Sequence, residues 1–241
     1  TRRVDDPNLL VAEASLDALV RLAPPDLGER LAHLMKTAQR DRKALADGPI
    51  RRQILYKLSA VPGPAATAAI AEAVLDDGQG DDRPEAVSRG AALLLVERDR
   101  SRAAKVLLAA LDSPLDHVKR NVVGPLADLG VQEALPKLRE LPGPQALSAR
   151  FRLGEAEALG LLLDALEGPD PMNAAWAVVE LGPAAEPALL ARLEAGRSFD
   201  LGAKILSRIG TERALPVLER LAGEHPEVVG PLGALKRRLG G

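Results

Sequence analysis

The chain has 241 residues, of which 46% are hydrophobic and 27% charged, so it can bury a core and is too polar for a membrane protein. Its formal net charge of −2 excludes a general attraction for nucleic acid, and the absence of cysteine excludes disulfides and thiolate metal sites. Aromatic residues make up only 2% of the chain. This low content favours many small contacts between helices over a single compact core, which usually uses more large rings.

The N-terminal part of the sequence predicts loosely regular helical units. Apolar residues at helical spacing indicate one unit over 7–36 and another over 49–78. Two longer polar connections, 37–48 and 76–83, separate the early units. A further unit, 84–113, begins the more regular part of the chain.

Two phrases occur twice in the second half of the chain. VVGPLADLG begins at Val122 and VVGPLGALK begins at Val228, with six of nine positions identical at an offset of 106. EALPKLRELPG begins at Glu133 and RALPVLERLAG begins at Arg213, at an offset of 80. Self-similarity of this kind is the signature of a repeat architecture.

A hydrophobic residue followed by glycine ends the first helix of each regular unit. The glycines are Gly130, Gly154, Gly182 and Gly210, at steps of 24, 28 and 28 residues, so one unit is about 27 residues long. We expect each glycine to adopt the left-handed conformation that terminates a helix.

Prolines mark other parts of the same unit. Pro136, Pro187 and Pro216 fall in the first turn of the second helix, where a missing N–H costs little. Pro125 and Pro231 follow glycines inside first helices, which we expect them to kink. No stretch alternates β-branched residues over five positions, so no strand is expected.

These patterns predict an all-α fold. We expect an α-solenoid, or superhelix, of about seven antiparallel helix pairs plus a C-terminal capping helix. The prediction is a single domain over 1–241, with loose repeats over 1–83, regular repeats over 84–224 and the capping helix over 225–241.

Two segments carry a family resemblance: LDHVKRNVVGPLADLGVQEALPKLREL (115–141) and GPDPMNAAWAVVELGPAAEPALLARL (168–193). They resemble HEAT-like repeats, particularly the short bacterial type, which reads as Asp-Pro, Val-Arg, small residues, Leu-Gly, and then Ala-Leu-Pro in a second helix. The resemblance covers most of the chain, most strongly from residue 84 onward. It implies an α-solenoid with a binding surface and no single activity, because the same stack hosts many functions.

Members of this family often carry an Asp–Arg pair that forms a ladder between units. Asp116 with Lys119 and Arg120 fits that pattern, and 50–52 fits it in part. The unit that begins at 199 lacks the arginine, so the ladder is interrupted there.

The sequence shows no catalytic, cofactor-binding or metal-binding motif. His33, His117 and His225 lie in different units, with no second histidine or cysteine at ligand spacing. No phosphate loop or nucleophile elbow occurs. We therefore expect no catalytic residue, no metal and no cofactor.

Three features of the sequence could either bind a ligand or have a purely structural role. The acids around two glycines at 76–85 could hold calcium, although their spacing favours a solvated connection; they are Asp76, Asp77, Asp81, Asp82 and Glu85. The mixed basic runs 39–43 and 97–102 could contact phosphate or form solvated turns. Trp176 is expected to pack between repeats, with ligand stacking as the alternative.

Charged side chains recur near the ends of the second helices. Arg139, Arg192 and Arg220 occupy equivalent places, and acids lie beside them in sequence: Glu140, Glu194 and Glu219. In HEAT-like stacks the second helices line the concave face, and here those helices carry more acids than bases. The pattern predicts that this face binds a protein or peptide of mixed charge. Solvated helix-end charges are the alternative.

The leading functional prediction is a non-enzymatic protein–protein interaction module. One alternative is nucleic-acid binding, including the HEAT-type alkylpurine DNA glycosylases, which need a basic groove lined with aromatic residues. Another is an enzyme or cofactor-handling protein similar to the bilin lyases, which share short HEAT-like units. The last is a fragment that serves as the structural part of a larger chain. Membrane and small-molecule partners are not expected, and a cytoplasmic location is. The chain begins at Thr1 without methionine, so we expect the N-terminus to be incomplete.

Overall fold

The fold of the chain is known from a computed structural model, which describes residues 9–37, 47–76 and 86–240. Every regular element in these residues is a helix and none is a strand, which confirms the predicted all-α class. The chain divides into two compact units, which we call unit 1 (1–134) and unit 2 (135–241). The single domain expected from the repeats stays a prediction.

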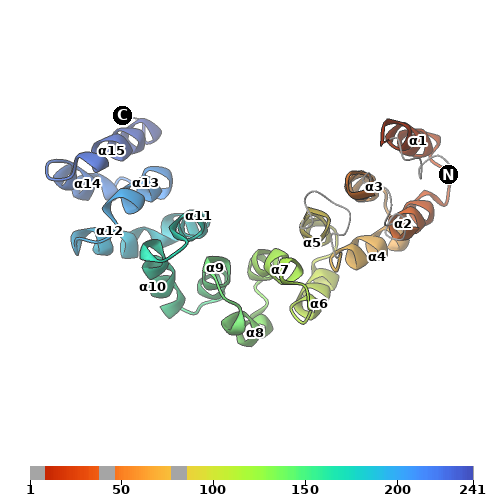
Figure 1. The fold of residues 1–241 in the computed structure, drawn as a ribbon, viewed down its shortest axis with the longest axis horizontal. Coiled ribbons are helices and arrows are strands. Elements are labelled where there is room, and N and C mark those ends of the chain that lie inside the picture. Colours follow the sequence, from red (N-terminus) through yellow and green to blue (C-terminus); the bar gives the residue numbers. More distant parts are fainter. Residues whose placement is uncertain (1–8, 38–46, 77–85, 241) are drawn as a thin grey trace. The chain divides into compact units, whose positions relative to one another are not determined.

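Unit 1 contains seven α-helices in its described residues. They are α1 (Leu9–Leu22), α2 (Leu27–Thr37), α3 (Asp47–Ala60), α4 (Pro64–Ala73), α5 (Ala86–Arg98), α6 (Arg100–Ala110) and α7 (Asp116–Leu129), followed by the 3₁₀ helix η1 (Gln132–Ala134). The first helices, α1, α3, α5 and α7, contact one another in chain order (Figure 1). The second helices pack beside them: α2 contacts α3, α4 contacts α3 and α5, and α6 contacts α5 and α7.

Three first helices of unit 1 bury the same stripe. The stripe has the spacing i, i+4, i+5 and i+8, which places four apolar side chains on one side of a helix. The buried residues are Ile50, Ile54, Leu55 and Leu58 in α3, Val87, Ala91, Ala92 and Leu95 in α5, and Val118, Val122, Val123 and Leu126 in α7. This common register makes positions on the three helices directly comparable.

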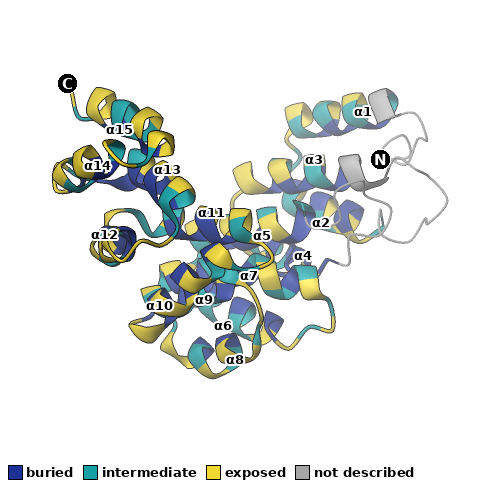
Figure 2. Cartoon of the chain, turned by 60° about the vertical axis from the view of Figure 1, so that its left-hand side comes forward, coloured by how far each residue is buried: buried dark blue, intermediate teal, exposed yellow. Residues whose placement is uncertain are grey.

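Unit 2 repeats the alternation of helices. Its elements are α8 (Leu135–Glu140), α9 (Pro144–Arg152), α10 (Glu157–Asp164), η2 (Ala165–Glu167), α11 (Pro171–Leu181), η3 (Gly182–Ala185), α12 (Glu186–Glu194), α13 (Phe199–Ile209), α14 (Ala214–Ala222) and α15 (Pro226–Arg238). The first helices, α9, α11, α13 and α15, contact one another in chain order, and α12 contacts α10 and α14. Buried residues of this unit form a hydrophobic cluster that runs from Leu159 to Leu235, and Figure 2 colours the buried positions dark blue along the helices.

The glycines that end the first helices do not all act alike. Gly130 has φ 70° and ψ 29°, the left-handed conformation predicted for it, and Gly154 also has a positive φ. Gly182 combines φ 61° with ψ −148°, which lies outside the left-handed helical region, so the prediction is wrong at Gly182. Gly210 has φ −61° and ψ 149°, so the prediction is wrong there. At that position the close backbone requires glycine, because a Cβ would lie 2.6 Å from the carbonyl oxygen of Leu206.

The prolines lie where the sequence predicts. Pro136, Pro187 and Pro216 occupy the first turn of α8, α12 and α14. Pro125 and Pro231 lie inside α7 and α15. The repeated VVGPL phrase therefore belongs to a first helix in both units.

Two arginines tie a first helix to the end of the preceding one. Arg98 at the end of α5 donates from Nη1 to the carbonyl oxygen of Leu58 at 2.9 Å and from Nη2 to that of Val61. Arg238 at the end of α15 does the same to α13, with Nε 3.1 Å from the carbonyl oxygen of Ser207 and Nη2 bonded to the carbonyl three residues further on. These carbonyls lie in the last turn of a helix or just beyond it, where the regular hydrogen bonds of the helix run out, so each arginine adds hydrogen bonds at a helix end.

Candidate functional site

The structure does not place the three predicted arginines alike. The side chains of Arg139 and Arg220 are 57% and 59% exposed, whereas that of Arg192 is only 8% exposed. Arg139 Nε lies 3.4 Å from the carboxylate of Glu155, and Arg220 Nη2 lies 3.0 Å from that of Glu194. Two of the three arginines are therefore at the surface and the third is inside the unit.

The acids beside these arginines lie at the surface, and the pairs they form join different helices. Glu194 of α12 pairs with Arg220 of α14, and Glu219 pairs with Lys236 of α15 at 2.7 Å. Glu140 is exposed at the end of α8. Both pairs join neighbouring helices within unit 2. A role for the six residues in partner binding stays a prediction.

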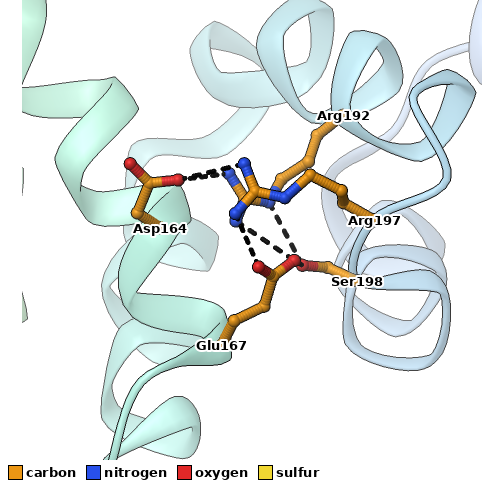
Figure 3. Close-up of polar contacts among 5 residues, drawn as sticks. All are labelled: Asp164, Glu167, Arg192, Arg197 and Ser198. Atoms are coloured by element: carbon orange, nitrogen blue, oxygen red, sulfur yellow. Dashed lines mark hydrogen bonds and ion pairs between the residues drawn. The ribbon is translucent and has the colours of Figure 1, made fainter.

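Arg192 is the centre of a charged cluster in unit 2 (Figure 3). Its Nη1 lies 2.8 Å from Asp164 Oδ1, its Nε donates to Ser198 Oγ at 3.1 Å, and its Nη2 lies 3.2 Å from Glu167 Oε1. Arg197 contacts the same two carboxylates, at 2.6 Å from Glu167 and 3.3 Å from Asp164. The hydroxyl of Ser198 donates to Glu167 at 2.7 Å.

The cluster balances two arginines against two carboxylates. Hydrogen bonds from Arg197 and then Ser198 lower the pKa of Glu167 from 4.5 to about 2. The hydrogen bond from Arg192 is the largest cause of the lowered pKa of Asp164. Both carboxylates are therefore ionised and engaged at neutral pH, which suits them to join α10 and η2 to α12 and not to act as acid–base catalysts.

A second charged pair lies in the interior of unit 1. Arg51 of α3 pairs with Asp76, and their side chains are 1% and 0% exposed. The backbone oxygen of Asp76 also lies 2.8 Å from Nε2 of His117. The calcium hypothesis therefore loses Asp76 as a free ligand, and its other four acids, at 77–85, lie outside the described residues.

The other candidate ligand-binding residues either make structural contacts or lie outside the described residues. The basic run 39–43 is not among the described residues. In the run 97–102, Asp99 accepts a hydrogen bond from the backbone N–H of Arg102 at 2.9 Å and so caps α6. In the described part of the chain, no three histidine, cysteine or acidic residues gather as a metal site.

The first helices of unit 1 present a surface that the sequence reasoning missed. The helices α3, α5 and α7 each carry an arginine at the same place relative to the buried stripe. Four residues after this arginine, α3 carries Tyr56, α5 carries Leu93 and α7 carries Gly124. The arginines are Arg52, Arg89 and Arg120. Tyr56 and Leu93 are exposed large hydrophobic residues, and another four residues along the helix α5 and α7 carry the exposed acids Glu97 and Asp128. We call this surface the banded face.

A signal for the banded face is present in the sequence. The segments IRRQILYKL (50–58), VSRGAALLL (87–95) and VKRNVVGPL (118–126) share an aliphatic first residue, arginine third and leucine ninth. They begin 37 and 31 residues apart, so a search for a 27-residue period does not align them. The arginine in the third position lies off the buried stripe and therefore at the surface.

Unit 2 exposes large apolar side chains on α11. Trp176 is 51% exposed, and Met172, one turn earlier on the same helix, is exposed as well. The guanidinium of Arg208, from α13, lies over the indole ring at 4.8 Å from its centroid. Trp176 thus packs against the first helix of the next repeat, as expected, while about half of its side chain stays exposed.

In comparisons with protein families, curated proteins and solved structures, no match to the chain is found. Among the helices of the described ranges, none has both the length and the apolar character needed to cross a bilayer. The resemblance to HEAT-like repeats therefore depends on the sequence segments 115–141 and 168–193.

Proposed function

We propose that the chain is a HEAT-like α-solenoid that works as a non-enzymatic protein-interaction module, with its contact surface on the first helices. The observation that carries the proposal is the half-exposed Trp176, next to Met172 and beneath the guanidinium of Arg208. Tryptophan and arginine are the residues most enriched among those that dominate binding energy at protein interfaces.

The chemistry around Trp176 suits a protein partner. The indole ring offers a large apolar area with few rotatable bonds, so little conformational entropy is lost when a partner covers it. Arg208 over the ring holds it in place by a cation–π contact. Glu180 and Lys204, both exposed on α11 and α13, provide polar groups around this apolar centre.

A contact surface on the first helices does not include the arginines that the sequence singled out on the second helices. Arg192 is buried and bonded to two carboxylates, so a partner that used it would first have to break the cluster. Arg139 and Arg220 are exposed and could still contribute at an edge, where a charge mainly affects the association rate.

The test compares two alanine variants of matched exposure. Trp176 is 51% exposed on a first helix and Leu161 is 50% exposed on the second helix α10, so Leu161→Ala is the control for Trp176→Ala. The full chain and both variants are immobilised, proteins retained from a lysate are identified by mass spectrometry, and each is then purified and its affinity measured. We expect Trp176→Ala to weaken a directly binding partner by about tenfold or more and Leu161→Ala to leave it unchanged.

Equal affinity of the partner for wild-type protein and Trp176→Ala would refute the placement of the surface. Loss of affinity in both variants to the same extent would indicate a general effect on folding, which far-UV circular dichroism of each variant would reveal. Failure of every retained protein to bind when purified would refute the interaction module itself.

A further inference from the structure

The banded face of unit 1 has a specific order of chemistry. Along α5 the order is Arg89, Leu93 and Glu97, one turn apart, and all three side chains are exposed. The same order of cation, apolar or small residue, and anion runs along α7, through Arg120, Gly124 and Asp128. On α3 the cation and the apolar residue are Arg52 and Tyr56.

These residues form bands that run across the helices. Four residues advance a helix by about 6 Å, so the bands lie about 6 Å apart along each helix axis. Neighbouring helices pack about 8–10 Å apart, which sets the spacing of side chains within a band. Residues i and i+7 of a partner helix are about 10.5 Å apart, so such a helix can place successive side chains along one band.

We infer that the banded face binds an amphipathic segment of a partner protein, with the acidic edge of that segment against the arginines and its apolar side against Tyr56 and Leu93. The inference rests on the proposed function, because it names the chemical class of a partner for a first-helix surface. It concerns unit 1, whereas the test of the proposed function uses Trp176 in unit 2.

Charge is the first argument for an acidic edge. Arg89 and Arg120 are exposed, and neither makes an ion pair within the described part of the chain. They place like charges on the adjacent helices α5 and α7, which is unfavourable for the protein alone and favourable once carboxylates face them. Protein interfaces commonly have an apolar centre with polar and charged residues around it. On the banded face, the exposed side chains of Tyr56 and Leu93 provide the apolar centre.

The opposite edge argues against a polyanion. Glu97 and Asp128 follow the apolar band on α5 and α7, so a nucleic acid lying over the face would meet carboxylates on that side. A segment with acids on one edge and bases on the other has complementary charge on both sides. The banded face therefore favours a peptide with separated charges over a uniformly charged chain.

The test selects peptides on the full-length protein from a display library of random 16-residue sequences. We expect the enriched peptides to combine aspartate or glutamate with large apolar residues, and the double variant Arg89→Glu/Arg120→Glu to bind them at least about tenfold more weakly. The control double variant Lys36→Glu/Lys105→Glu makes the same change in charge on exposed second-helix positions and is expected to retain them. Circular dichroism checks that each variant is folded.

Each outcome has a separate meaning. Enriched peptides that lack acids, or that bind the Arg89→Glu/Arg120→Glu variant as well as wild type, would overturn this inference and leave the interaction module standing. Salt-sensitive binding of a 20-base-pair duplex that is lost in the same variant would assign the face to a polyanion and also overturn it. A library that yields no binding peptide on wild-type protein would also overturn this inference, whereas the comparison of Trp176→Ala with Leu161→Ala would still decide the interaction module.

Discussion

Replacing Asp76 with alanine removes the carboxylate that faces Arg51 in the interior of unit 1. The two side chains are 0% and 1% exposed, so neither the guanidinium nor the carboxylate can be rehydrated without opening the fold. Loss of one partner from a buried pair typically costs about 3–5 kcal/mol, because the remaining charge stays buried. We expect Asp76→Ala to lower the free energy of unfolding by that amount.

Replacing both partners should be far less harmful. In Arg51→Met/Asp76→Leu no charge remains to be buried, and apolar replacements of similar volume are often neutral or stabilising. Asp26→Ala is the control at the surface, because Asp26 and Arg30 are 46% and 45% exposed and such a pair contributes less than about 1 kcal/mol.

Urea unfolding followed by far-UV circular dichroism measures these free energies. The fluorescence of Trp176, the only tryptophan of the chain, reports separately on unit 2. An Asp76→Ala protein within about 1 kcal/mol of wild type would refute the argument from burial. So would a double variant as unstable as the single one.

Three further outcomes are expected from unit 2. Arg192→Ala should cost about 1–2 kcal/mol and Arg220→Ala less than about 1 kcal/mol in urea unfolding, because only Arg192 is buried; equal costs would contradict this. The pKa of Glu167 is about 2 in the folded protein and 4.5 ordinarily, so its contribution to stability is present above pH 4.5 and is lost as the pH falls towards 2; Glu167→Gln should flatten the acid limb of the stability profile. Deleting 225–241 removes α15 with two fully buried side chains and should lower the melting temperature or cause aggregation, whereas an unchanged melting curve would show that α15 is dispensable.

The helices and their ends could be predicted from local patterns because those depend on neighbouring residues. Apolar spacing together with the glycine at 130 or 182 places α7 and α11 within a few residues of where they lie. Gly210 shows the limit of that reasoning. It ends α13 with extended backbone and not with the left-handed conformation, and a hydrophobic residue followed by glycine does not distinguish these two ways of ending a helix.

The charged sites could be predicted only in part because they depend on contacts between residues of neighbouring repeats. Arg192 and Asp164 are 28 residues apart, the same step that separates two of the predicted glycines, so a search for opposite charges at that separation would find the pair. The burial of Arg192 could not be found in this way. It requires Glu167 and Ser198 to close around the guanidinium, whereas Arg220, at the equivalent position, remains exposed.

The contact pattern within the units also bears on how the chain acquires its structure. In unit 1 the principal contacts of each helix are with elements one or two places along the chain, and none requires a residue beyond 134. Contacts between near neighbours close short loops, so little entropy is lost before they form, and topologies of this kind fold quickly. During synthesis, Arg98 can therefore reach the end of α3 as soon as α5 has left the ribosome, and unit 1 can assemble its internal contacts while unit 2 is still being translated.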